Sequence, residues 1–233
     1  MVVSNTQPRF PDRNTVIPGG EAGATPVGCS KRLKVAPVGV KAARYAVEHW
    51  HYSGCLPAGK TFKVGVWEDD QFIGVVIFSR GANNRLGSRL GLPEQRHCVE
   101  LTRIALDRHA NPVTRIVRFA LKEMRKYNPD VRAVISFADP EQGHHGGVYQ
   151  GGGWEYIGKS QAQAELIVNG RLMHKRSAGS KYGTASIPKL QAMGVNAQRS
   201  PAFWKHTYAK GFDRNIKNRL RRMAKPAPSK MTA

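Results

Sequence analysis

The residues best suited to chemistry lie together in the segment AVISFADPEQGHHGGVYQGGGWEYIG, which covers residues 133–158. Its first five residues include Val, Ile and Phe, which are typical of a buried strand, and Asp139-Pro140 ends that strand. Tyr149 follows at the start of a short predicted helix, four residues before Gly153. Ligands of open α/β sheets bind beyond the strand ends, so this carboxylate and phenol indicate a functional site.

Four residues are candidates for catalysis. Tyr149 is suited to donating a proton to a leaving group or to stacking on a nucleobase, although packing in the core is an alternative role. Ser136 lies on the preceding strand, where it either positions a ligand or fills the core. Glu100 and Arg103 share one strand but face opposite sides, so only one faces a given cleft unless a bulge intervenes. The predicted catalytic set is Ser136, Asp139, Tyr149 and Arg103.

The charge balance indicates a polyanionic partner. The chain of 233 residues has 37 Lys and Arg against 16 Asp and Glu, a net charge of +21. From Gly170 onward there are fifteen Lys and Arg and a single acid, Asp213. Such a block neutralises the phosphates of nucleic acid. A solubilising tail, a ribosomal role and a membrane-surface role are the alternatives.

Two basic clusters are predicted to bind DNA. The first surrounds the 80–96 loop and clamps phosphates, with a solvated loop as the alternative. The second lies after Ser200, where Trp204 and Tyr208 are interleaved with bases and are predicted to stack on unpaired nucleotides. The predicted DNA-binding residues are Arg80, Arg85, Arg89, Lys205, Lys210, Arg219, Arg221 and Arg222.

Other classes of protein are disfavoured. The three cysteines, Cys29, Cys55 and Cys98, form no CxxC pair, which argues against a disulfide scaffold and a cysteine zinc site. No apolar run approaches the roughly 18 residues of a membrane span. The first residues lack a signal-peptide pattern. We therefore expect a cytoplasmic protein without a membrane partner.

The elements expected around these residues form a mixed α/β (α+β) fold. Alternation and helical periodicity predict the order β-α-β-β-β-α-β-α-β-β, ending in a hairpin with an Asn169-Gly170 type I′ turn. We expect the core to be complete by about Arg176. The predicted domains are a flexible or irregular arm (1–30), a catalytic domain (31–180) and a basic DNA-binding extension (181–233).

Two resemblances refine this interpretation. The order of elements resembles that of the GNAT acyltransferases, which implies a twisted mixed sheet flanked by helices. The segment Tyr149-Gln-Gly-Gly-Gly-Trp154 resembles the family's Tyr-x-x-x-Gly-aromatic feature, which lies near the thiol of coenzyme A. Five segments in order are more specifically similar to the Mom family of phage DNA-modifying proteins: HWHYSGCLPAGK, FIGVVIFSRG, CVELTRIAL, SFADP and VYQGGGW. The Mom resemblance implies conversion of adenine in DNA to N6-carbamoylmethyladenine, which protects phage DNA from host restriction.

The resemblance also implies cofactors. The Mom family is associated with iron (Fe²⁺), and His51, Tyr52 and Asp139 are the predicted ligands, with His144 and His145 as alternatives. The position of the GNAT phosphate loop reads LDRHANPVTR and contains no glycine, but Arg108 and Arg115 flank a helix start that is able to hold an anion. The donor therefore stays open between acetyl-CoA and another acyl or aminoacyl compound.

The preferred hypothesis is a DNA adenine-modifying transferase that acts on double-stranded DNA with a flipped adenine in a phage-infected or prophage-bearing cell. Two alternatives stay open: an ordinary GNAT N-acetyltransferase that uses acetyl-CoA, and a non-catalytic nucleic-acid-binding protein. The sequence patterns carry no signal for an oligomeric state.

Overall fold

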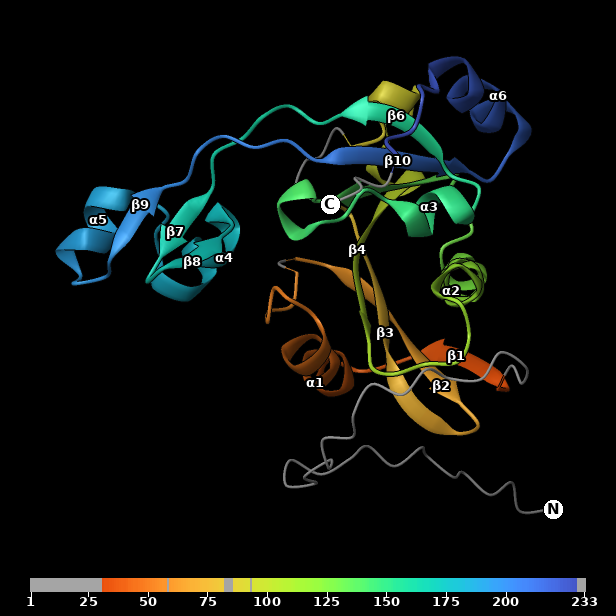
Figure 1. Cartoon of the computed structure of the whole chain (residues 1–233), viewed down its shortest axis with the longest axis horizontal. Helices are drawn as coiled ribbons and strands as arrows, with labels where there is room; N and C mark the ends of the chain where they lie inside the picture. Colours follow the sequence, from red (N-terminus) through yellow and green to blue (C-terminus); the bar gives the residue numbers. More distant parts are fainter. Residues whose placement is uncertain (1–30, 58, 82–85, 93, 230–233) are drawn as a thin grey trace. The chain divides into compact units, whose positions relative to one another are not determined.

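The computed structural model describes residues 31–57, 59–81, 86–92 and 94–229 (Figure 1). The arm expected at residues 1–30 lies outside the described residues. The chain forms two compact units by its contacts: unit 1 takes its residues from Met1–Leu56, Phe62–Ile77 and Arg103–Tyr127, and unit 2 from Pro57–Thr61, Phe78–Thr102 and Asn128–Ala233. The domain boundary expected near residue 180 falls inside unit 2.

A seven-stranded mixed sheet has the strand order β1-β2-β3-β4-β5-β10-β6 (Figure 1). β4 pairs with β5 in parallel, whereas β10 pairs antiparallel with both β5 and β6. The predicted mixed sheet is thus confirmed. Its strands are β1 (Leu33–Pro37), β2 (Thr61–Glu68), β3 (Gln71–Ser79), β4 (Cys98–Leu106), β5 (Ala133–Ala138), β6 (Glu155–Lys159) and β10 (His206–Gly211).

Two helices follow the apolar periodicity of unit 1. α1 (Val40–Trp50) buries Ala43, Ala46 and Val47 against Trp67 and other side chains of β2 and β3. α2 (Val113–Tyr127) contacts β1 and buries a stripe of five apolar residues with helical spacing. The stripe consists of Ile116, Val117, Ala120, Leu121 and Met124.

In unit 2, one face of β5 and β10 is closed by a basic amphipathic helix, α6 (Arg214–Met223). The Asp213 side chain caps this helix by accepting a hydrogen bond from the Ile216 amide. Ile216 and Leu220 pack with Ala133 and Ile135 of β5. Each such buried aliphatic side chain contributes about 1.5–3 kcal/mol. This basic helix therefore forms part of the core.

Four short elements complete unit 2 beside the sheet. η1 (Ser88–Leu90) and η2 (Gln95–His97) precede β4, and η3 (Pro140–Gln142) and α3 (Gly147–Gly151) follow β5. No described helix combines the length and hydropathy that crossing a bilayer requires.

A separate group of short elements, which we call the lobe, spans residues 164–202. A three-stranded antiparallel sheet in the order β8-β7-β9 packs with two helices around Leu166, Val168, Ala178, Leu190 and Ala197. The Asn169-Gly170 hairpin is confirmed as the connection between β7 and β8. The lobe comprises β7 (Leu166–Val168), β8 (Arg171–Met173), α4 (Lys175–Tyr182), α5 (Ile187–Ala192) and β9 (Ala197–Arg199).

The expectation that the core is complete by about Arg176 is wrong. β10 lies between β5 and β6, with Tyr208 opposite Ser136 on one side and opposite Tyr156 on the other. Its residues alternate between the two faces of the sheet, so polar and apolar side chains are mixed in the sequence. The strand therefore lacks the apolar run that marks a buried strand.

A chain that ends after Ser200 should lose cooperative thermal unfolding, because it lacks the strand that joins β5 to β6 and the α6 side chains that cover them. Circular dichroism during heating measures this. A chain shortened only by residues 230–233 is the control. A cooperative transition at the full-length midpoint in the shorter chain would contradict the central role of β10.

Candidate active site

Ser136 lies at the point where the pairing of β4 with β5 ends. The ladder joins Cys98–Leu101 to Ala133–Ser136, and Ser136 is its last paired residue. The buried Ser136 hydroxyl donates to the Leu101 carbonyl at 2.7 Å. This bond fixes the side chain at the strand end, where backbone groups no longer find partners in the β4–β5 ladder.

Tyr149 reaches the same hydroxyl from α3. Its Oη lies 2.7 Å from Ser136 Oγ. The Ser136 hydroxyl is the donor in this pair, as it is to the Leu101 carbonyl. Because serine has one hydroxyl proton, it serves only one of these acceptors at a time, and Tyr149, Ser136 and Leu101 form a hydrogen-bonded relay.

β10 supplies further polar side chains to this face of the sheet. Tyr208 is opposite Ser136, and His206 is opposite Ala138. Tyr156 of β6 is opposite Tyr208. Residues directly opposite each other in an antiparallel pair share a face, so the hydroxyls and the imidazole are gathered on one side.

The rings of this face are in continuous contact. Tyr149 lies 5.3 Å from Tyr208, Tyr208 lies 5.3 Å from Tyr156, and Tyr156 lies 5.5 Å from His206, all between ring centroids. Burial raises the pKa of both Tyr156 and Tyr208, so these two phenols stay protonated at neutral pH. We call Ser136, Tyr149, Tyr156, His206 and Tyr208 the hydroxyl–imidazole cluster.

His206 is a buried imidazole that is neutral at physiological pH. Burial lowers its pKa, and the positive charges of Lys159 and His145 lower it further. Its Nδ1 lies 3.2 Å from the Tyr156 hydroxyl. Trp204 contacts it edge-on at 4.9 Å between centroids. A neutral imidazole held in this way is suited to accepting a proton.

The segment that carries Tyr149 is held in place by β10. The Tyr208 hydroxyl donates to the His145 carbonyl at 2.6 Å and accepts from Gln150 Nε2 at 2.9 Å. Lys210 Nζ donates to the carbonyls of Gly152 and Gly153 at 2.8 and 3.1 Å. The short helix α3 is thus positioned mainly by side chains from a strand that lies more than fifty residues later in the sequence.

Asp139 ends β5 as the sequence predicts, but its carboxylate is already engaged. Oδ1 accepts from the Glu141 amide at 3.1 Å, which caps η3, and Oδ2 is 3.1 Å from Lys205 Nζ. The Asp139 side chain is buried, and the pair is charge-balanced. Lys205, expected to bind DNA, therefore neutralises Asp139 instead of offering a free ammonium group.

The predicted metal ligands do not present a ready site. His51 is the C-cap of α1, and its Nδ1 accepts from the Ser53 amide at 3.1 Å. The same nitrogen lies 2.8 Å from the Ser53 hydroxyl, so it is engaged by Ser53, while Tyr52 stacks on the ring at 4.3 Å between centroids. Among the described residues, no group of three or more His, Cys, Asp or Glu is placed to hold a metal. Iron binding stays a prediction, and no step below is assigned to it.

The predicted anion site at the start of α2 is filled by a side chain of the protein. The buried Glu68 carboxylate accepts from the amides of Ala110 and Asn111 at 2.9 and 2.7 Å. It also accepts from Asn111 Nδ2 at 2.7 Å. Burial raises the pKa of Glu68, but these hydrogen bonds outweigh burial and lower it. Amides that would cradle a pyrophosphate are therefore already used, although Arg108 and Arg115 are exposed nearby in the sequence.

The other predicted residues are dispersed. Arg103 lies in β4 within unit 1 and is half-buried. Arg80, Arg89, Arg221 and Arg222 are exposed, and Arg85 lies outside the described residues. Arg219 Nη1 donates to the Leu90 carbonyl at 3.1 Å, which ties α6 to η1.

A cavity of about 450 Å³ in unit 1 is lined by none of the predicted site residues. Two ion pairs, Arg32–Asp70 and Lys126–Glu123, occupy its wall. The hydroxyl–imidazole cluster is therefore the better candidate for an active site.

Known proteins are similar to this chain over most of its length. The model of the Mom protein family matches residues 32–229. The chain belongs to the Mom protein family. One relative is the methylcarbamoylase mom of Escherichia phage Mu, which is 32% identical over 136 residues, or 57% of this chain and 56% of that protein. The aligned region thus spans little more than half of the curated relative.

Solved acetyltransferases are also similar. A probable acetyltransferase from Staphylococcus epidermidis ATCC 12228 is 7% identical, with a TM-score of 0.44 over 78% of this chain and 100% of that chain. A probable acetyltransferase of the GNAT family from Chromobacterium violaceum ATCC 12472 is 13% identical, with a TM-score of 0.44 over 88% and 97%.

Sequence reasoning missed two members of the cluster in this Mom-family protein, His206 and Tyr156. It named a third, Tyr208, but did not predict that this side chain is buried. Tyr208 is fully buried, so the stacking role expected for it is wrong. A signal was present, because His206, Tyr208 and Lys210 alternate with Thr207 and Ala209 with the period of a strand. The Lys and Arg residues around this segment favoured its interpretation as a DNA-binding extension instead of a strand.

Gly146→Ala should disrupt the site more than Gly143→Ala. Both glycines have positive φ, +88° and +69°, so both changes carry a similar backbone cost of about 1–2 kcal/mol. At Gly146 the added methyl would also collide with the Tyr208 ring, whereas at Gly143 it meets nothing within 4 Å. Overpacking adds about 1–3 kcal/mol. Equal unfolding free energies in urea for both variants would contradict the close approach.

Glu68→Gln should lower the free energy of unfolding at pH 7 by about 1–3 kcal/mol, because the amide cannot satisfy all three donors. Because the pKa of Glu68 is lowered on folding, its contribution is present above its usual value of 4.5 and is lost as the pH falls through the folded pKa. The difference from wild type should therefore shrink in acid. The exposed Glu48, changed to Gln, is the control, and a pH-independent difference would refute the charge effect.

Proposed function

We propose that this protein is a DNA-modifying transferase that converts adenine in DNA to N6-carbamoylmethyladenine and so protects the DNA from restriction. Membership of the Mom family and the name of the phage Mu relative support the reaction class. The observation that carries the assignment to a site is the Tyr149–Ser136–Leu101 relay at the end of β5.

The chemistry needs two proton transfers. When adenine N6 forms a bond to the carbamoylmethyl carbon of a donor, N6 loses a proton and the donor's leaving group gains one. The neutral His206 imidazole is the proposed acceptor, and the Tyr149 phenol is the proposed proton source for the leaving group. Ser136 then orients the phenol. These roles use only groups of the hydroxyl–imidazole cluster.

The substrate is proposed to be duplex DNA with the target adenine extruded. An adenine inside the duplex cannot reach buried groups such as His206, so base flipping is required. The net charge of +21 supports a polyanionic substrate. The ring contacts that run from Tyr149 through Tyr208, Tyr156 and His206 to Trp204 support stacking of the extruded base at one end of this series.

An ordinary acetyl-CoA-dependent N-acetyltransferase is less well supported. The amides at the start of α2 serve Glu68, and the loop before this helix lacks glycine. A non-catalytic nucleic-acid-binding role does not explain why a hydroxyl relay and a neutral imidazole are built into one sheet face. Iron and the identity of the donor stay predictions.

Expression in a bacterium that carries a plasmid should yield a deoxyadenosine derivative in which one carbamoylmethyl group replaces a hydrogen. Mass spectrometry of digested plasmid nucleosides measures this. Tyr149→Phe, which keeps the ring and removes the proton source, should reduce the modified fraction or its rate of formation by about 10²–10⁴-fold.

Tyr127→Phe is the matched control, because Tyr127 is an exposed tyrosine at the end of α2. Unmodified deoxyadenosine throughout, from well-expressed folded protein, would overturn the proposed reaction. Full modification by Tyr149→Phe would leave the reaction standing and remove Tyr149 from it.

A further inference from the structure

The lobe at residues 164–202 lies between β6 and β10 in the chain and contributes no strand to the seven-stranded sheet. It is carried on a two-stranded ribbon between β6 and β10. Gln163 and Phe203 exchange both backbone hydrogen bonds, at 2.9 and 3.1 Å, at the point where the ribbon enters the lobe. The lobe has its own apolar core. A self-contained insertion of this kind adds a surface to the protein.

That surface is strongly positive. The lobe sequence contains six Lys and Arg and one acid, Glu165. The five basic residues whose side chains are described are all exposed, and among the described residues none of them forms an ion pair. They are Arg171, Lys175, Lys181, Lys189 and Arg199. Elsewhere in unit 2, by contrast, Lys205 and Lys210 bind groups of the protein itself.

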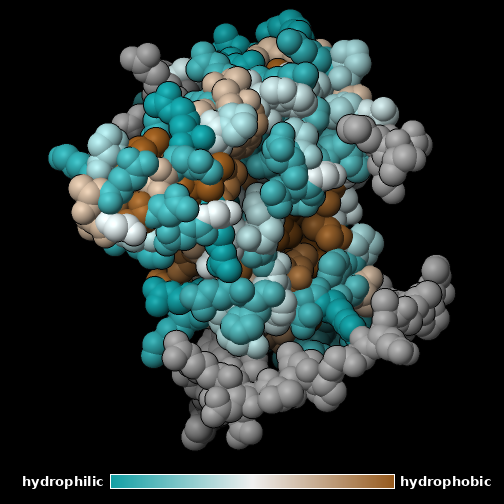
Figure 2. Space-filling view, turned by 60° about the vertical axis from the view of Figure 1, so that its left-hand side comes forward, coloured by the Kyte–Doolittle hydropathy of each residue, from teal (hydrophilic) through white to brown (hydrophobic). Residues whose placement is uncertain are grey.

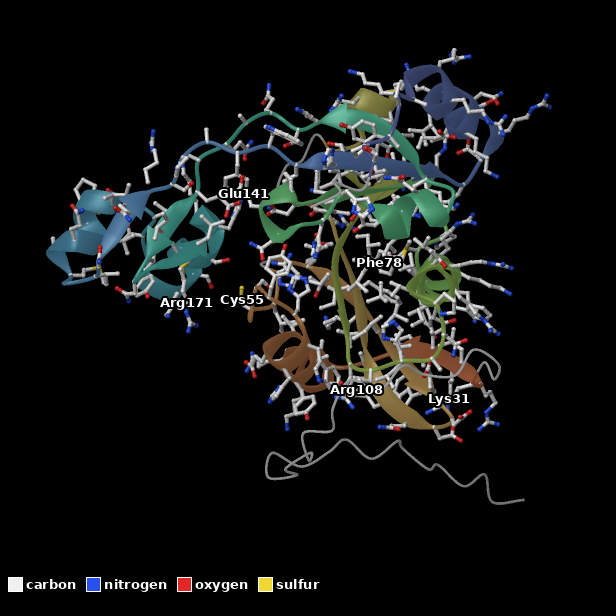
Figure 3. The ribbon with its side chains drawn as sticks, in the orientation of Figure 1. Lys31, Cys55, Phe78, Arg108, Glu141 and Arg171 are labelled. Carbon is white, nitrogen blue, oxygen red and sulfur yellow. The ribbon has the colours of Figure 1, made fainter. Side chains whose placement is uncertain are left out.

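The β7–β8 hairpin gives the lobe a defined projecting element. Asn169 and Gly170 have φ values of 50° and 77°, as a type I′ turn requires. Arg171 follows at once, and its side chain, labelled in Figure 3, is exposed. Leu172 is 48% exposed. The hairpin tip therefore carries one basic side chain, Arg171, and one exposed apolar side chain, Leu172.

Strand register places the apolar part of this tip on the face away from the lobe core. Leu166 and Val168 point into the core, so Ile167 and its partner Leu172 point to the other side. Figure 2, which brings this side of the molecule forward, shows hydrophilic side chains with smaller apolar areas among them. Such a mixed surface suits a groove bordered by phosphates.

We propose that the lobe is a duplex-DNA-binding module in which the β7–β8 hairpin enters a groove and the surrounding Lys and Arg side chains contact phosphates. The major groove admits β-strands, and the hairpin presents β8, an edge strand of the lobe's three-stranded sheet, from which Leu172 is able to contact base methyl groups. The identity of the polyanion rests on the proposed function. The lobe has no part in the proposed proton transfers.

The ribbon geometry allows the lobe to be removed cleanly. Since Gln163 and Phe203 form a hydrogen-bonded antiparallel pair, a two-residue Asn-Gly turn can join them in place of residues 164–202. The excised protein should keep cooperative unfolding. Its Kd for a fluorescent duplex should rise, and the slope of log K against log salt should fall by about 0.9 for each phosphate that the protein no longer neutralises.

A second variant keeps the lobe and removes charge only. The variant should lower the slope of log K against log salt by up to about 2.7, the value for three phosphates left without a basic partner. It combines Arg171→Gln, Lys175→Gln and Arg199→Gln. The control removes the same charge from exposed residues of unit 1 through Lys41→Gln, Arg44→Gln and Arg118→Gln. If the excised protein does not fold, this pair of triple variants decides the question.

Unchanged Kd and salt slope in the folded variants, or equal losses of affinity in the lobe and control triples, would overturn the proposal. If the lobe variants lose as much affinity for single-stranded RNA as for duplex DNA, the proposal that the hairpin enters a groove of the duplex is wrong. Binding is measured without turnover, so it is separable from the reaction. If the wild-type protein modifies no DNA, the proposed function is wrong. If the protein modifies DNA but binds it equally well without the lobe, only the proposed role of the lobe is wrong.

Discussion

The backbone pairing of β10 with β5 on one side and β6 on the other holds the candidate site together. Through this pairing, Tyr208 comes to lie opposite Ser136 and Tyr156, and His206 opposite Ala138. The same strand sends Tyr208 and Lys210 to the carbonyls of His145, Gly152 and Gly153, which fixes the helix that carries Tyr149. A ladder of backbone hydrogen bonds thus sets the geometry of the side chains that are suited to proton transfer.

Burial gives these side chains their chemical character. Desolvation disfavours charged forms, so the pKa of His206 is lowered and the pKa values of Tyr156 and Tyr208 are raised. An imidazole without its proton and phenols with theirs can coexist at neutral pH. The nearby positive charge of Lys205 is offset by Asp139. The charge of Lys159 remains near the cluster and favours the neutral form of His206, whose pKa it lowers.

At the start of α2, too, a buried charged group is satisfied by partners within the chain. A carboxylate at a helix N-terminus is favourable because the first amides lack partners within the helix. Glu68 meets this need from within the chain, at 2.7–2.9 Å from its donors. In a protein that bound a pyrophosphate there, the ligand would supply that negative charge. A pyrophosphate could not use the amides of Ala110 and Asn111 while Glu68 accepts their hydrogen bonds.

The sequence by itself determined the elements with strong periodicity. α1, α2, the β2–β3 hairpin, β5 and the Asn169-Gly170 turn follow from apolar spacing and turn chemistry, which act between near neighbours. The end of β5 at Asp139 and the importance of Tyr149 were also predictable, because strand ends concentrate functional groups. Family membership was predictable from five short motifs in order.

Only the tertiary structure decided what the basic residues and the last strand do. A lysine that pairs with a buried carboxylate and one that faces solvent look alike in a sequence, so Lys205 and Arg222 could not be told apart. β10 was hidden because one of its faces carries His206, Tyr208 and Lys210, which have no apolar periodicity. The reason is physical: local propensity reports contacts within a few residues, whereas β10 gains its place from partners about fifty and seventy residues away in the chain.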